Sequence, residues 1–214
     1  MVTGGTGAIG RPLVERLLAR GHAVRALARA GSAGRLPHGA QAIAGDALDA
    51  RSVAAALRPG DTLVHLVGTP HPNPAKAAAF ERVDLASIRA SVAAASEVGI
   101  AHLVYVSVAQ PAPVMKAYVA VRARGESLIA DARLTATMVR PWYVLGPGHR
   151  WPLLLLPLYA LASLVPATRE RAERLGLVTL DAMIAALTRA VETPPEPGMR
   201  RIVDVPAIRA ARLA

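Results

Sequence analysis

A glycine-rich segment near the start of the chain constrains the fold more than any other feature. It reads Val2-Thr3-Gly4-Gly5-Thr6-Gly7-Ala8-Ile9-Gly10 and separates a short apolar stretch from a stretch of helical periodicity that reaches residue 20. Glycines in this pattern allow a tight turn and the close approach of a pyrophosphate, while the N-terminus of the following helix offers free N–H groups to phosphate oxygens. The segment therefore predicts a nucleotide-binding turn made by Gly4, Gly5, Thr6, Gly7, Ala8, Ile9 and Gly10.

Short apolar runs then alternate with helical stretches, which is typical of consecutive β-α-β units. The expected strands are 1–3, 23–28, 41–44, 62–67, 102–107 and 135–140. The expected helices are 9–20, 51–57, 77–98 and 117–132, with Asp49 or Ala50 near the N-cap of the second, and with Gly21 and Gly99 as helix terminators. The pattern predicts an α/β fold of the Rossmann type, in which a doubly wound parallel sheet carries helices on both faces.

The last third of the chain is less regular. Residues 151–166 are apolar but are interrupted by Pro152, Pro157 and Pro166, so the stretch is too short and too broken for a membrane span. A buried helix or a lid over a substrate pocket is favoured, and a membrane-facing or subunit-facing patch stays the alternative. Thr179 can cap a helix over 180–192, and 201–205 reads as a late strand. We expect residues 1–214 to form a single domain, in which 141–214 make a small C-terminal region on the substrate side.

Composition and charge exclude several classes of protein. With 53% hydrophobic and 3% aromatic residues, the core must consist of Ala, Val, Leu and Ile, which suits buried parallel strands. The positive charge comes almost entirely from arginines that are scattered along the chain and form no basic run beyond the pair Arg200-Arg201, so we expect no nucleic-acid partner. The chain has no cysteine, which excludes disulfides and thiolate chemistry, and its six histidines are isolated, so no metal site is expected.

The position of the glycine-rich segment also bears on where the protein works. Because it begins so close to Met1, we expect no signal peptide before it and a cytoplasmic location. A first strand of residues 1–3 is short for this pattern, so we expect either a stunted strand or a natural start further upstream.

The end of the second expected strand indicates which dinucleotide would bind. In NAD-binding folds an acidic side chain there accepts hydrogen bonds from the adenosine ribose, but no Asp or Glu occurs between Glu15 and Asp46. Arg29 stands at that strand end instead, with Arg25 on the same strand, and a guanidinium suits the 2′-phosphate of NADP. NADP is therefore favoured over NAD. Binding of NAD remains an alternative, and so does the interpretation of Arg29 as a solvated surface arginine.

Several segments together resemble the atypical or extended short-chain dehydrogenases/reductases, including epimerase/dehydratase-like and NmrA-like members. They are TGGTGAIG with its helix, the VRALAR strand, GDALD at 45–49, YVSV at 105–108 and VRPWYVLGPG at 139–148, and the likeness covers residues 1–150. The resemblance implies that Asp46, with Ala47, contacts the adenine and that Val67 and Gly68 border a cofactor ribose. It also implies that Arg140 and Pro141 lie beside the nicotinamide.

The same resemblance implies an active site. In this family a Ser or Thr, a Tyr and a Lys four residues later transfer the proton while the nicotinamide carries the hydride. Ser107 and Tyr118 match two of these positions, and the third is Arg122, which shares a helical face with Tyr118. Arg122 can lower the pKa of the phenol and bind ribose hydroxyls, but a guanidinium cannot shuttle a proton. The alternative to a catalytic Tyr118 is a tyrosine that only packs in the core or contacts the cofactor. Asp84 stands at a position where relatives often carry Asn.

Two classes of function follow. The first is an oxidoreductase or epimerase/dehydratase-like enzyme that uses NADP and acts on a small, apolar carbonyl or hydroxyl substrate. The second is a non-catalytic dinucleotide-binding regulator or accessory subunit. A homodimer is an open alternative, and peripheral membrane association through 151–166 is a weaker one.

Overall fold

The computed structural model describes residues 1–146 and 175–211, and a parallel sheet forms its centre. The strand order is β3-β2-β1-β4-β5-β6-β9. The strands are β1 (Val2–Thr3), β2 (Arg25–Ala28), β3 (Gln41–Ala44), β4 (Thr62–His65), β5 (His102–Val106), β6 (Ala136–Val139) and β9 (Arg200–Val203). Each neighbouring pair is parallel, and Val2 lies opposite Ala26 on one side and Val64 on the other. The direction of winding thus reverses between β1 and β4.

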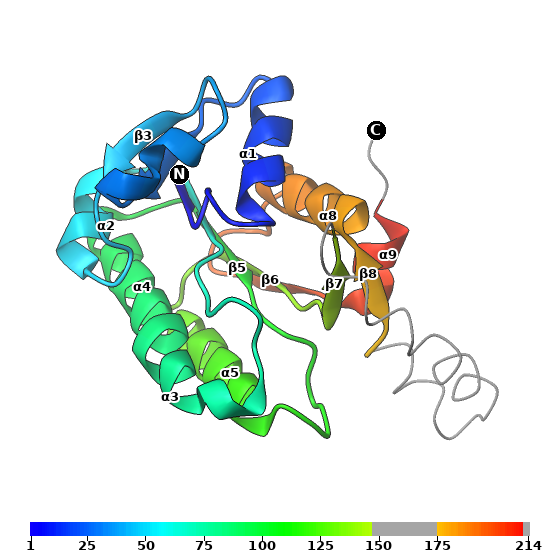
Figure 1. Ribbon diagram of the computed structural model, residues 1–214. Helices are drawn as coiled ribbons and strands as arrows, with labels where there is room; N and C mark the ends of the chain where they lie inside the picture. The colour runs from blue at the N-terminus through cyan, green and yellow to red at the C-terminus, as the bar shows by residue number, and fades with distance from the viewer. Residues whose placement is uncertain (147–174, 212–214) are drawn as a thin grey trace.

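Helices cover both faces of this sheet (Figure 1). Neighbouring helices α2, α4 and α5 pack together on one face, and α1, α8 and α9 pack together on the other. Their bounds are α1 (Gly10–Ala19), α2 (Ala50–Ala56), α4 (Ala86–Val98), α5 (Lys116–Asp131), α8 (Leu180–Glu192) and α9 (Val205–Ala210). The predicted doubly wound α/β fold is confirmed.

Two apolar cores separate the sheet from its helices. Leu13 and Val14 of α1 pack with Met183 and Leu187 of α8 on one face, and the opposite face buries residues such as Phe80. Small and branched side chains fill most of both cores, as the scarcity of aromatic residues predicts.

Several predicted helix ends are confirmed. The Asp49 carboxylate accepts hydrogen bonds from the N–H groups of Arg51 and Ser52 at the start of α2. The Thr179 hydroxyl accepts one from Ala182 N at the start of α8, and Gly99 ends α4 in the left-handed conformation at φ +73°. A short polar side chain and a glycine are the residue types that these two conformations favour.

Other predicted bounds are corrected by the structure. Strand β4 ends at His65, not at 67, and its pairing with β1 ends at the same residue, opposite Thr3. The expected helix 77–98 consists of α3 (Ala77–Ala79), the π-helical segment η3 (Phe80–Leu85) and α4. A wider π turn moves the residues after it to a new face, which helical periodicity does not reveal.

Some elements were missed. The 3₁₀ turns η1 (Ala30–Arg35) and η2 (Pro74–Lys76) lie in expected loops, and β7 (Tyr143–Leu145) pairs in parallel with β8 (Leu177–Thr179) in a separate small sheet. The late strand predicted at 201–205 ends at Val203, because Asp204 caps helix α9 and Pro206 lies in its first turn. That Asp-x-Pro pattern is a helix-start signal.

The apolar stretch 151–166 lies outside the described residues. Among the helices of 1–146 and 175–211, none is long and apolar enough to cross a membrane.

An alanine at position 10 should disrupt the first turn, because its Cβ would lie 2.1 Å from the Gly4 carbonyl oxygen. We expect Gly10→Ala to lower the free energy of unfolding, measured by urea titration, by about 3 kcal/mol, the upper part of the range for overpacked sites. Gly31→Ala is the matched control, since a Cβ there meets nothing within 4 Å. Equal stability of the two variants would contradict the close approach of Gly4 and Gly10.

Candidate functional site

The glycine turn joins β1 to α1 at the edge of the sheet where the parallel strands end. Gly4 has φ +79°, and a Cβ on it would lie 2.9 Å from the Leu66 carbonyl carbon, so the turn lies directly against the segment after β4. Gly7 and Ala8 are exposed, and no side chain caps α1 or places an acidic group in its first turn. The backbone N–H groups at the start of α1 are therefore not covered by a capping side chain, and they are suited to bind the oxygens of a pyrophosphate.

The two arginines of the second strand have different surroundings. Arg25 is engaged inside the protein, because its guanidinium donates to the Ala56 carbonyl at 2.9 Å and pairs with Asp61. Arg29 follows the last residue of β2 and is exposed, and its side chain makes no hydrogen bond or ion pair within the described chain. Of the two, only Arg29 is free to meet a ligand at this edge.

Asp46 and Ala47 follow β3 at the same edge. The Asp46 carboxylate accepts a hydrogen bond from Leu48 N at 3.0 Å, and its own N–H donates to the Ser52 hydroxyl at 2.9 Å. Asp46 is exposed and Ala47 half-buried. The structure therefore gives Asp46 a turn-forming role and leaves its second carboxylate oxygen without a bond among the described residues.

On the other side of β1, Val67 and Gly68 lie in the half-buried segment that follows β4. Leu66 N donates to Thr3 O at 3.0 Å, which holds this segment beside the glycine turn. A Cβ on Gly68 would lie 2.2 Å from the Nη2 atom of Arg122. A side chain at position 68 would therefore have to displace the guanidinium of Arg122.

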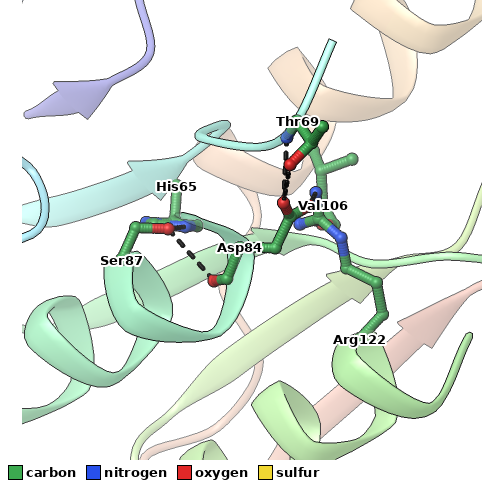
Figure 2. A network of polar contacts seen from close by, with 6 residues as sticks. All are labelled: His65, Thr69, Asp84, Ser87, Val106 and Arg122. Atoms are coloured by element: carbon green, nitrogen blue, oxygen red, sulfur yellow. Dashed lines mark hydrogen bonds and ion pairs between the residues drawn. The ribbon is translucent and has the colours of Figure 1, made fainter. Parts of the chain in front are cut away.

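Arg122 is 5% exposed and belongs to a polar network around Asp84 (Figure 2). Its Nη2 donates to Asp84 Oδ1 at 2.6 Å, and its Nη1 donates to the Val106 carbonyl at 2.9 Å. Its guanidinium carbon lies 5.2 Å from the centre of the Tyr118 ring, a cation–π distance. Both terminal nitrogens are thus engaged inside the protein, and sequence reasoning missed the partnership with Asp84.

The ionisation of this network follows from burial and charge. Burial acts to lower the pKa of Arg122, but the acidic groups around it outweigh burial and raise that pKa above its ordinary value. Burial raises the pKa of Tyr105 to about 12. Arg122 is therefore a permanent cation, and Tyr105 stays protonated at neutral pH.

Ser107 is the first residue after β5, and Tyr118 lies in the first turn of α5. Ser107 is 2% exposed, and its hydroxyl has no hydrogen-bond partner within residues 1–146 and 175–211. Tyr118 is half-buried, with its ring 5.0 Å from that of Phe80. A buried hydroxyl without a hydrogen-bond partner costs free energy, so the Ser107 hydroxyl is a candidate to bind a ligand at the end of β5.

Arg140 and Pro141 follow β6. The Arg140 guanidinium donates to both carboxylate oxygens of Glu126, at 2.9 Å from Nε and 2.5 Å from Nη2, and Gln110 donates to the same carboxylate. Pro141 is buried, and its carbonyl accepts from Ala109 N. Sequence reasoning missed Glu126, although its place four residues after Arg122 on a helix that covers β5 and β6 could have indicated it.

An open cavity of about 500 Å³ lies beside this pair and the start of α5. Its lining residues are Gln110, Pro111, Ala112, Lys116, Val119, Ala120 and Arg140.

His65 is fully buried between β1 and α4. Its Nδ1 lies 3.2 Å from Thr3 Oγ1 and 2.9 Å from Ser91 Oγ, and its Nε2 lies 3.3 Å from Ser87 Oγ. Since Ser87 Oγ donates to the Asp84 carbonyl, Nε2 carries the proton of the neutral ring. Burial, with the nearby Arg122 cation, lowers the pKa of His65 to about 3. No group of three His, Asp or Glu in the described part of the chain could hold a metal ion.

Comparisons with known proteins agree with this geometry. A family model described as NAD(P)H-binding matches residues 4–149. A ceramide reductase from Caulobacter vibrioides is 26% identical over 90% of this chain and 61% of its own length. A 3-diazoavenalumate denitrifying reductase from a Streptomyces species is 29% identical over 97% of this chain and 76% of its own length.

The fold is also found among solved structures. UDP-glucuronic acid 4-epimerase from Bacillus cereus, in complex with NAD, superposes with a TM-score of 0.68 at 17% identity, over 95% of this chain and 76% of that one. At this identity the likeness shows the fold. The present chain spans 61% of the length of the ceramide reductase.

The depressed pKa of His65 makes stability depend on pH. The unfolded chain binds a proton to this ring below its ordinary pKa of 6.5, but the folded chain binds none until about pH 3, so stability is complete above 6.5 and falls as the pH drops between the two values. From pH 7 to 5 this ring alone should cost about 2 kcal/mol of unfolding free energy, measured by urea titration.

We expect His65→Asn to remove that part of the pH dependence, whatever its effect on stability at pH 7. The exposed His38 supplies the control, since His38→Asn should leave the slope unchanged. An unchanged slope in His65→Asn would show that the ring is not buried in its neutral form.

Proposed function

This chain belongs to the NAD(P)H-binding family, and from that premise we propose that it is an NADP-dependent reductase of a small, apolar carbonyl compound. The observation that carries the proposal is the buried, partnerless hydroxyl of Ser107 at the edge of the sheet where α5 brings in Tyr118. The names of the two relatives described above, a ceramide reductase and a denitrifying reductase, support reduction as the reaction class.

The cofactor assignment rests on the free arginine. The 2′-phosphate of NADP is a dianion near neutral pH, and an exposed guanidinium at the end of β2 is the group that would bind it. The glycine turn, from Gly4 to Gly10, would hold the pyrophosphate, and Asp46 with Ala47 would border the adenine. Val67, Gly68, Arg140 and Pro141 would line the nicotinamide side.

Bound NADPH would supply the hydride. The Ser107 hydroxyl would donate a hydrogen bond to the substrate carbonyl oxygen, and the Tyr118 phenol would give its proton to that oxygen as the alcohol forms. Arg122, lying over the Tyr118 ring, would stabilise the phenolate until solvent returns the proton. Residues 141–214 would contribute the substrate side, since β7 and β8 pair beyond the end of β6.

A non-catalytic dinucleotide-binding regulator or accessory subunit is the second candidate. The observation that favours it is that the cation over the Tyr118 ring is Arg122, whose guanidinium does not exchange protons near neutral pH and whose terminal nitrogens are both engaged inside the protein. Tight binding of NADPH without turnover on any carbonyl compound would support this candidate.

An epimerase or dehydratase would retain the cofactor in its oxidised form and act on a hydroxyl compound.

Arg29→Ala should weaken the binding of NADPH and leave the binding of NADH unchanged. Loss of a charge-assisted contact to the 2′-phosphate should raise the Kd of NADPH about tenfold, measured by cofactor fluorescence, while the Kd of NADH stays within about twofold. Arg35, exposed in the neighbouring turn η1, supplies the control variant Arg35→Ala. An equal loss for both cofactors, or no loss for either, would contradict the assignment of NADP.

Tyr118→Phe should separate binding from chemistry. Removing the phenol proton should lower kcat by about 10²-fold or more in a screen of aliphatic ketones and aldehydes, followed by NADPH absorbance. The Kd of NADPH should stay within about twofold, because a phenol that only donates a proton contributes little to ground-state affinity. Unchanged turnover in this variant would exclude Tyr118 as the acid.

A further inference from the structure

A chain of polar contacts runs from the glycine turn to α5, and Figure 2 shows its central part. Thr3, the residue before Gly4, contacts His65, and His65 contacts Ser87. The Ser87 hydroxyl then donates to the Asp84 carbonyl at 3.1 Å. Asp84 thereby connects the turn at the end of β1 with the helical residues that face α5.

The Asp84 carboxylate has no exposed surface and accepts three hydrogen bonds. Thr69 donates from its backbone N at 2.9 Å and from Oγ1 at 2.5 Å, both to Oδ2, while Arg122 donates to Oδ1 at 2.6 Å. A buried carboxylate is tolerated only when it is paired in this way. The segment 66–69 is thus fastened to Asp84 at one end and to Thr3 at the other.

The topology indicates which half of a dinucleotide this segment would meet. Strands β2 and β3 lie on one side of β1, and β4 and β5 lie on the other. In a doubly wound sheet the adenosine half lies toward the end of β2, so the opposite half lies toward the ends of β4 and β5. The segment 66–69, which follows β4 directly, belongs to the nicotinamide side.

We propose that Asp84 is a positioning residue for the nicotinamide half of the cofactor: it holds segment 66–69 in place and draws Arg122 inward, so that Arg122 braces the site and does not bind ribose. Two observations carry this. Both terminal nitrogens of Arg122 are engaged, and Gly68 has no Cβ, which leaves room for the guanidinium against its backbone. The inference rests on the proposed dinucleotide binding.

The test compares two ligands by isothermal titration. NADPH reaches both halves of the site, whereas 2′,5′-ADP carries the adenosine and 2′-phosphate but lacks the nicotinamide. Asp84→Asn keeps the shape but loses the charge, and we expect it to raise the Kd of NADPH about tenfold and to change that of 2′,5′-ADP by less than about twofold. Glu81→Gln is the matched control, because Glu81 pairs with Arg124 across the same two elements at an exposed site, and it should change neither Kd.

Each remaining outcome decides the question. Equal weakening of both ligands by Asp84→Asn, or no weakening of either, overturns the inference, because a merely structural residue affects both halves alike. If Asp84→Asn does not fold, Thr69→Val decides, since it removes the hydroxyl and keeps the ion pair. We expect it to raise the Kd of NADPH about threefold and to spare 2′,5′-ADP, and an unchanged Kd overturns the inference.

The failure of the proposed function has a different signature. A wild-type chain that binds neither NADPH nor NADH refutes dinucleotide binding itself. A chain that selects NADH is tested in the same way with NADH and ADP.

Discussion

The buried ion pair between Asp84 and Arg122 is the interaction on which the candidate site, at the carboxyl ends of the parallel strands, depends. Two charges removed from water are stable together only if each also satisfies its other hydrogen-bonding atoms, and removing one partner of such a pair costs about 3–5 kcal/mol. Thr69 meets that requirement for Asp84, and the Val106 carbonyl meets it in part for Arg122, whose Nε has no partner in the described residues. The pair therefore fixes the ends of β4 and β5, the π-helical segment η3 and the start of α5 relative to one another.

Two half-buried arginines are neutralised in the same local way. Arg25 pairs with Asp61 below the second strand, and Arg140 pairs with Glu126 beside the sixth. Arg29 differs from both, because it is exposed and without a partner in the described residues. This exposed guanidinium at the end of β2 is the basis on which NADP binding is proposed.

Periodicity and turn chemistry predicted most elements that depend on local interactions. Asp49, Thr179 and Gly99 end or begin helices where expected, because a cap needs only its own neighbours along the chain. The missed elements depend on distant partners. Strand β7 is short and exists through its pairing with β8, more than thirty residues later. The π turn in η3 likewise brings Asp84 toward Arg122, which no pattern within 77–98 contains.

The sequence by itself determined the doubly wound fold, the glycine turn and the identity of the residues at the strand ends, because the order and spacing of glycines and apolar runs decide these features. Only the tertiary structure decided which arginine is free and which is engaged, since Arg25, Arg29, Arg122 and Arg140 are alike in sequence. Their roles differ because Asp61, Asp84 and Glu126 reach three of them from distant segments. The role of a charged side chain inside a protein depends on the group with which it pairs, and folding brings such groups together from distant parts of the chain.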